Sequence, residues 1–148
     1  MSTSILIVQR LLEGAVPGCP KLWIGAVDVR DVADLHLRAM SSPQAAGERF
    51  LAVGPSLWIS EMAEILREQL GPAGAKVPHR TFPDLFVRLA ARFDPGLRSF
   101  TADLGRRIEF SNDKARQRLG WAPRPTQDTL VECADSLLAQ QEPAAAAA

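Results

Sequence analysis

Residues 27–40, VDVRDVADLHLRAM, decide the predicted fold because two different periodicities meet within them. Val27 and Val29 alternate as in a strand, and apolar residues then recur at helical spacing as far as Met40. Three aspartates crowd the junction: Asp28, Asp31 and Asp34. A carboxylate at this place caps free backbone N–H groups and complements the positive end of the helix dipole. The stretch therefore predicts a strand that runs directly into a capped helix.

Helical segments outnumber strands in the rest of the chain. Helices are predicted at residues 5–13, 60–70, 83–93 and 126–140, with a helical piece ending at Leu104 and a helix from Ser111 or Asn112 to Gly120; strands are predicted at 23–29, 48–53 and 107–110. The run Phe50-Leu51-Ala52-Val53 lacks polar alternation, which suits a strand buried on both faces of a parallel sheet. The pattern favours an α/β fold with few strands.

Three phrases of the sequence resemble one protein family. They are VDVRDVADLHLRAM at residues 27–40, GERFLAVG at 47–54 and SNDKARQRLGWAPRP at 111–125. Together they are similar to the C-terminal part of the extended short-chain dehydrogenase/reductases, in the aldehyde reductase/dihydroflavonol reductase-like branch of the NAD-dependent epimerase/dehydratase superfamily. The resemblance covers residues 2–138. It implies an incomplete Rossmann-type fold, with an outer sheet strand and a small, mostly helical substrate domain.

The motifs that carry the chemistry of this family are missing. Family members open with a Gly-x-x-Gly-x-x-Gly turn that brings the backbone to the cofactor pyrophosphate, and they use a Tyr-x-x-x-Lys pair at the substrate oxygen. The chain contains no tyrosine, and Gly71-Pro72-Ala73-Gly74 follows a predicted helix instead of a strand. The resemblance therefore implies the substrate-side portion of an NAD(P)-dependent oxidoreductase that acts on a small carbonyl or alcohol substrate, without a catalytic residue of its own.

The complete family member would bind NAD or NADP, whereas we expect the chain alone to bind neither and to be inactive. Its expected partner is the nucleotide-binding half of the same fold. Two alternatives stay open: a non-catalytic binding or regulatory module that pairs with a separate nucleotide-binding subunit, and a truncated reading frame. A lone apolar strand edge at residues 48–53 also predicts self-association.

Ser4 is the one candidate cofactor contact. In the resembled reductases, a small hydroxyl residue just before the helix equivalent to residues 5–13 can touch the cofactor phosphate or the nicotinamide side. Ser4, with Thr3 beside it, is the matching position. The alternative role for Ser4 is the N-cap of that helix.

Other polar residues have simpler interpretations. His36 falls on the apolar side of its helix and is interpreted as a core histidine. The aspartate trio does not converge on one point if all three residues are helical, so capping is favoured over metal binding. His79 is either a wall of the substrate pocket or a surface residue. The tryptophans Trp23, Trp58 and Trp121 are interpreted as packing anchors.

Composition excludes several classes of function. Seventeen basic and seventeen acidic residues give a formal net charge of zero, and Phe86, Phe93 and Phe100 have core-like spacing, so no nucleic-acid surface is expected. The two cysteines form no metal or disulfide pattern, which favours a reducing cytoplasm. No signal peptide or membrane span is predicted. Residues 1–142 are expected to form the folded portion, and residues 143–148 a disordered alanine-rich tail.

Overall fold

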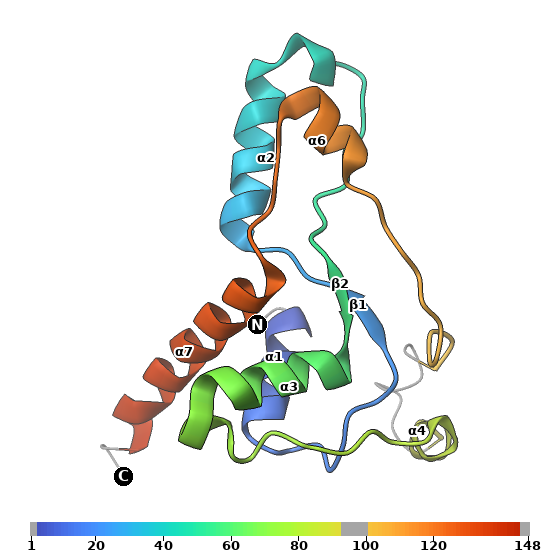
Figure 1. Ribbon diagram of the computed structural model, residues 1–148, viewed down its shortest axis with the longest axis vertical. Helices are drawn as coiled ribbons and strands as arrows, with labels where there is room; N and C mark the ends of the chain where they lie inside the picture. Colours follow the sequence, from blue (N-terminus) through green and yellow to red (C-terminus); the bar gives the residue numbers. More distant parts are fainter. Residues whose placement is uncertain (1–2, 93–100, 146–148) are drawn as a thin grey trace. The chain divides into compact units, whose positions relative to one another are not determined.

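The structure, a computed structural model, describes residues 3–92 and 101–145 (Figure 1). Helices dominate it, and its two strands form one two-stranded sheet. The elements in chain order are α1 (Thr3–Leu12), β1 (Trp23–Gly25), α2 (Val29–Ser41), η1 (Pro43–Ala45), β2 (Ser56–Trp58), α3 (Ile59–Leu70), η2 (Gly71–Gly74), α4 (Asp84–Ala90), α6 (Asp113–Leu119) and α7 (Thr126–Ala145). No helix among these is both long and apolar enough to cross a membrane.

The chain divides into two compact units. Unit 1 comprises Met1–Trp23, Trp58–Arg107 and Leu130–Ala148, and unit 2 comprises Ile24–Leu57 and Ile108–Thr129. The chain passes from one unit to the other within β1, at the end of β2, between Arg107 and Ile108, and near the start of α7. Each unit therefore combines segments that lie far apart in the sequence.

Unit 1 has its core around α1 and α3. Leu11, Leu66 and Val77 are at most 1% exposed. Cys19, which forms no disulfide, is also 1% exposed. The backbone of Cys19 pairs with the segment that precedes α4, because its N–H donates to the carbonyl of Arg80 and its carbonyl accepts from the N–H of Phe82. Burial raises the pKa of the Cys19 thiol, so this group remains neutral in its apolar surroundings.

Unit 2 has a separate, smaller core between α2 and α6, which lie side by side in Figure 1. Its centre is Trp121, which is fully buried, with Leu35 from α2 and Leu119 from α6 around it. α6 ends at Gly120, whose φ of 61° is the left-handed conformation that glycine adopts most readily. This stop returns the chain toward α2 and places Trp121 in the core.

The strand predicted at residues 48–53 does not form, and these residues have no regular secondary structure. Phe50 and Ala52 pack against the unit 2 core, whereas Leu51 between them is 47% exposed. The segment is thus buried on one side only, and the uniformly apolar run misled the prediction. A strand also needs a ladder of backbone partners, whereas the backbone hydrogen bonds that this segment makes with described residues are a local one from the Glu48 N–H to the Ala45 carbonyl and one from the Asn112 side chain to the Val53 carbonyl.

Other predicted elements also differ from the structure in their bounds. β1 ends at Gly25 instead of residue 29, because Asp28 is already the N-cap of α2. Residues 107–110, predicted as a strand, have no regular structure and are exposed. The predicted helical piece before Leu104 falls largely on residues 93–100, outside the described residues, and 101–105 form turns. α7 runs to Ala145, and the predicted tail at 143–148 stays a prediction because its last three residues are not described.

Candidate functional site

Asp28 caps α2, as the sequence predicted. Its Oδ1 accepts a hydrogen bond of 2.8 Å from the backbone N–H of Arg30, and the guanidinium of Arg30 donates to both carboxylate oxygens. The hydrogen bond from the Arg30 side chain is the main cause that lowers the pKa of Asp28 to about 2. Both oxygens of the Asp28 carboxylate therefore take part in capping the N-terminus of α2.

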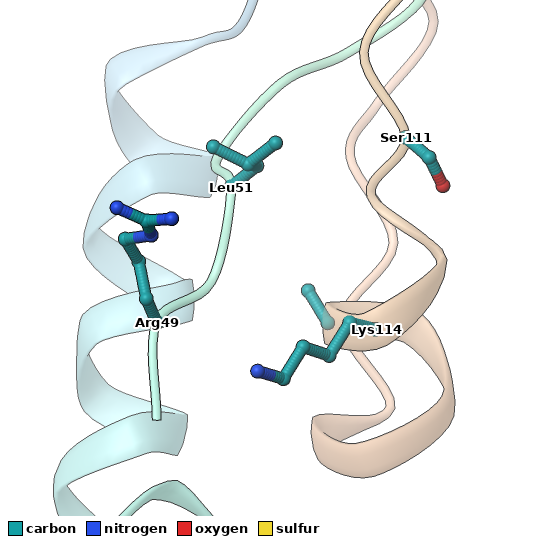
Figure 2. A pocket seen from close by; sticks show the side chains of 5 residues that line it. Arg49, Leu51, Ser111 and Lys114 are labelled. Carbon is teal, nitrogen blue, oxygen red and sulfur yellow. The ribbon is translucent and has the colours of Figure 1, made fainter. Parts of the chain in front are cut away.

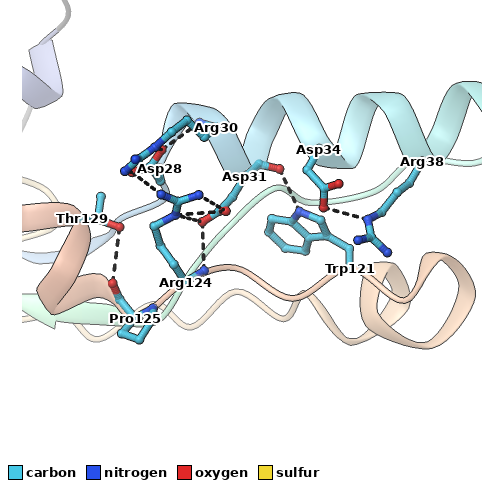
Figure 3. A network of polar contacts seen from close by, with 9 residues as sticks. All are labelled: Asp28, Arg30, Asp31, Asp34, Arg38, Trp121, Arg124, Pro125 and Thr129. Carbon is cyan, nitrogen blue, oxygen red and sulfur yellow. Dashed lines mark hydrogen bonds and ion pairs between the residues drawn. The ribbon is translucent and has the colours of Figure 1, made fainter. Parts of the chain in front are cut away.

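Asp31 ties α2 to the segment between α6 and α7 (Figure 3). Its carboxylate accepts from the Arg124 backbone N–H at 2.9 Å and from the Arg124 guanidinium at 3.0 to 3.2 Å. Its carbonyl accepts from the indole Nε1 of Trp121 at 2.8 Å. The hydrogen bonds that the Arg124 side chain donates to Asp31 are the main cause that raises the pKa of Arg124. These contacts hold α2 to the segment between α6 and α7 within unit 2. Both carboxylate oxygens of Asp31 are used in them.

Asp34 pairs with a third arginine, Arg38, at 2.7 Å on the exposed side of α2. Each of the three aspartates therefore pairs with an arginine, and Arg124 contacts both Asp31 and, at 3.7 Å, Asp28. No group of three metal-ligating side chains occurs within the described part of the chain. Arg38 also donates to the carbonyls of Leu119 and Gly120, so it helps to end α6.

The two histidines lie on the surface. His36 is exposed, and its Nδ1 lies 2.7 Å from the Val32 carbonyl, so the prediction of a core histidine is wrong. The helical spacing predicted that Leu35 and His36 both lie at the edge of the apolar side of the helix. In the structure only Leu35 of these two is buried. His79 is also exposed, which fits a surface residue and the wall of an open pocket equally well.

Ser4 lies inside α1, because this helix begins at Thr3, two residues earlier than predicted. Its backbone is therefore in the first helical turn and not at the predicted N-cap. The match between Ser4 and a cofactor contact remains a prediction.

Trp23 and Trp58 form an aromatic cluster with Arg107 in unit 1. The ring centroids of the two indoles are 5.1 Å apart at an interplanar angle of 65°, an edge-to-face pair. The Arg107 Cζ lies 4.3 Å from the centroid of the Trp23 ring. Both indoles are half-buried, and Nε1 of Trp23 is buried without a hydrogen-bond partner in the described part of the chain.

From the sequence, the three tryptophans were predicted only as packing anchors, which Trp121 is. Nothing in the sequence indicated that Arg107 meets Trp23, since the two residues are far apart in the chain and no periodicity relates them. The cluster combines flat apolar faces with a guanidinium that donates hydrogen bonds. This combination can contact the apolar body and the carbonyl oxygen of one organic compound.

The binding of a dinucleotide requires more than the described residues offer. A pyrophosphate site uses a glycine-rich turn between a strand and the N-terminus of a helix. Gly71–Gly74 instead forms η2 at the C-terminal end of α3. The described residues therefore do not fit the pyrophosphate of this cofactor.

Comparison with known proteins identifies reductases. No protein-family model matches the chain. The ketoreductase azaE of Aspergillus niger is 31% identical over 128 residues, which are 86% of this chain and 32% of that protein. The chain thus spans about a third of the length of this curated relative.

Solved structures of reductases have the same fold. The crystal structure of gox2253 matches with a TM-score of 0.71 and 22% identity, over 95% of this chain and 44% of that one. Yeast methylglyoxal/isovaleraldehyde reductase Gre2, solved with NADPH, matches with a TM-score of 0.69 and 21% identity, over 96% of this chain and 37% of that one. The resemblance found in the sequence is thereby borne out at the level of the fold: this chain has an incomplete Rossmann-type α/β fold that matches part of each of these two structures.

Proposed function

We propose that this chain is the substrate-side portion of an NAD(P)-dependent oxidoreductase that acts on an aldehyde, ketone or alcohol and is inactive alone. The observation that carries the proposal is its similarity to a ketoreductase over 86% of its own length, although it spans only 32% of that protein. Reduction of a carbonyl needs a proton at the substrate oxygen as well as a hydride. The chain has no tyrosine to supply that proton in the manner of the family.

Within this portion, the proposed role of the aromatic cluster is to position the substrate. The indole faces of Trp23 and Trp58 would cover the apolar body, and the guanidinium of Arg107 would donate to the carbonyl oxygen. These residues would bind and orient the substrate and would not transfer a proton, because a guanidinium remains charged. Ser4 would contact a cofactor that the nucleotide-binding half holds.

A complementation experiment tests this proposal. The chain would be co-expressed with the nucleotide-binding half of a reductase of the Gre2 type, and the oxidation of NADPH with methylglyoxal would be followed by absorbance. We expect no turnover by either piece alone and measurable turnover by the pair, with a higher KM for Arg107→Gln and an unchanged KM for the exposed control Arg116→Gln. Turnover by the chain alone, or failure of the pieces to associate, would contradict the proposal.

A second candidate function is a non-catalytic module that pairs with a separate nucleotide-binding subunit. It is favoured by the apolar side of α2, where Val29, Leu37 and Met40 are 78%, 66% and 83% exposed. A contiguous apolar surface of this kind is typical of protein–protein contacts. Stable association without any reductase activity would favour this alternative over the first.

A further inference from the structure

Unit 2 holds a cavity that is separate from the aromatic cluster and does not depend on the proposed function. It measures about 320 Å³ and lies between the extended segment 48–53 and the start of α6 (Figure 2). Its lining residues are Arg49, Leu51, Ser111, Lys114 and Ala115. Pockets that bind small ligands start at about this size.

A neighbouring contact shows that the cations at this place hold a carboxylate. The carboxylate of Glu48 accepts from Lys114 Nζ through one oxygen and from Arg118 Nη1 through the other, both at 2.5 Å. The hydrogen bond from Lys114 is the main cause that lowers the pKa of Glu48. The ionised carboxylate is thus the form that this cluster stabilises.

Arg49 adds a further positive charge across the cavity from Lys114. Its side chain is exposed, and within residues 3–92 and 101–145 it forms no ion pair. The other nearby acid is Asp113, which accepts a hydrogen bond from the lining hydroxyl of Ser111. Two cations and no acid therefore line the cavity, and of these two Lys114 already shares its charge with Glu48, which leaves Arg49 as the cation without an acidic partner among the described residues.

The remaining wall is apolar. It is formed by Leu51, which is 47% exposed, and by Ala115, which is 1% exposed. A plain inorganic anion would leave these apolar side chains in contact with water, whereas a ligand with a short apolar body would bury them.

We infer that this cavity binds a small organic carboxylate with a branched or short apolar tail. The guanidinium of Arg49 donates to both oxygens of the carboxylate, Lys114 contributes a positive charge that it shares with Glu48, and the tail lies mainly against the exposed side chain of Leu51. Binding is weak because the cavity is open and both cations are exposed.

Titration of the full chain, followed by two-dimensional amide NMR, tests this inference. The probes are 4-methylpentanoate, acetate (no apolar tail), 4-methylpentanamide (no charge) and inorganic phosphate. We expect saturable shifts at Leu51, Lys114 and Ala115 with 4-methylpentanoate, several-fold weaker binding of acetate and phosphate, and none of the amide. Equal affinity for phosphate or for the amide would overturn the inference, as would the absence of saturable shifts.

A pair of matched variants separates the cavity from the general charge of the surface. Arg49→Gln should weaken the binding of 4-methylpentanoate by about fivefold or more, because a charge-assisted hydrogen bond is lost. Arg116→Gln removes the same charge from an exposed position on α6 outside the cavity and should leave the affinity unchanged. An equal loss in both variants would mean that the ligand responds to net charge alone, and the cavity would not be its site.

Discussion

Asp31 and Arg124 lie 93 positions apart in the sequence, and their side chains and backbone meet in unit 2. The sequence placed Asp31 at the start of a helix but could not place Arg124 opposite it, because nothing in the local pattern of residues 120–125 identifies a partner. Capping by Asp28 was predictable, since it depends only on residues two positions apart. At the residue scale, local contacts were accessible to prediction and distant ones were not.

Asp31→Asn should lower the free energy of unfolding by about 1–3 kcal/mol, because the substitution leaves the Arg124 guanidinium without its charged acceptor at a buried position. Urea unfolding followed by far-UV circular dichroism measures the change. Asp34→Asn is the matched control on the same helix. Its exposed pair with Arg38 should change stability by less than about 1 kcal/mol. Equal effects of the two substitutions would contradict the role assigned to Asp31.

The pH dependence of stability should show the capping by Asp28. Its pKa is about 2 in the folded protein, below the ordinary value of 3.8, so its contribution is complete above pH 4 and is lost as the pH falls toward 2. We expect the melting temperature of the wild type to fall more steeply between pH 4 and pH 2 than that of Asp28→Asn. Parallel curves for the two proteins would show that the carboxylate of Asp28 contributes nothing over this range.

At the scale of elements, helices were predicted well and strands poorly. Helix caps and stops such as Asp28 and Gly120 are local signals, and α2, α3, α6 and α7 begin within a few residues of their predicted starts. Strands depend on partners elsewhere in the chain, which explains why residues 48–53 and 107–110 lack the predicted strand structure. Periodicity also misled where a helix has little to pack against: Phe86 on α4 was predicted as core and is 63% exposed.

The close approach of residue 54 to the segment after β1 can be tested directly. A Cβ at Gly54 would lie 2.3 Å from the Ala26 carbonyl oxygen, which also accepts the Gly54 N–H. Gly54→Ala should therefore lower the free energy of unfolding by about 1–3 kcal/mol or more through overpacking. Gly47→Ala meets no atom within 4 Å but keeps a φ of +72°, so it measures backbone strain alone, about 1 kcal/mol. Chemical unfolding of both variants should rank Gly54→Ala as the less stable.

At the scale of the whole molecule, the described residues include large apolar side chains that are exposed. The apolar side of α2 and the exposed Leu51 belong to a chain that spans about a third of its curated relative. The partial match could be predicted from the sequence, because the phrases that resemble the family are present and its glycine-rich and tyrosine motifs are not. The sequence could not predict which apolar side chains of α2 are exposed, since their exposure depends on how α2 packs against the rest of the unit.

We expect the chain alone to bind a hydrophobic dye and to self-associate at high concentration. Leu37→Glu should reduce both, because it places a charge in the middle of the apolar side of α2. Gln117→Glu adds the same charge at an exposed position on α6 and should change neither. Dye fluorescence and size-exclusion chromatography measure the two effects. A monomeric wild type that binds no dye would show that these residues form no associating surface.

The proposed function requires that the catalytic and dinucleotide-binding residues lie on another part of the fold, outside this chain. The most direct test is to incubate the purified chain with NADPH or NADH and an aldehyde or ketone, and to follow the absorbance of the reduced nicotinamide. We expect no turnover and, in a parallel calorimetric titration, no appreciable binding of the dinucleotide. Turnover by the chain alone would contradict the proposed function.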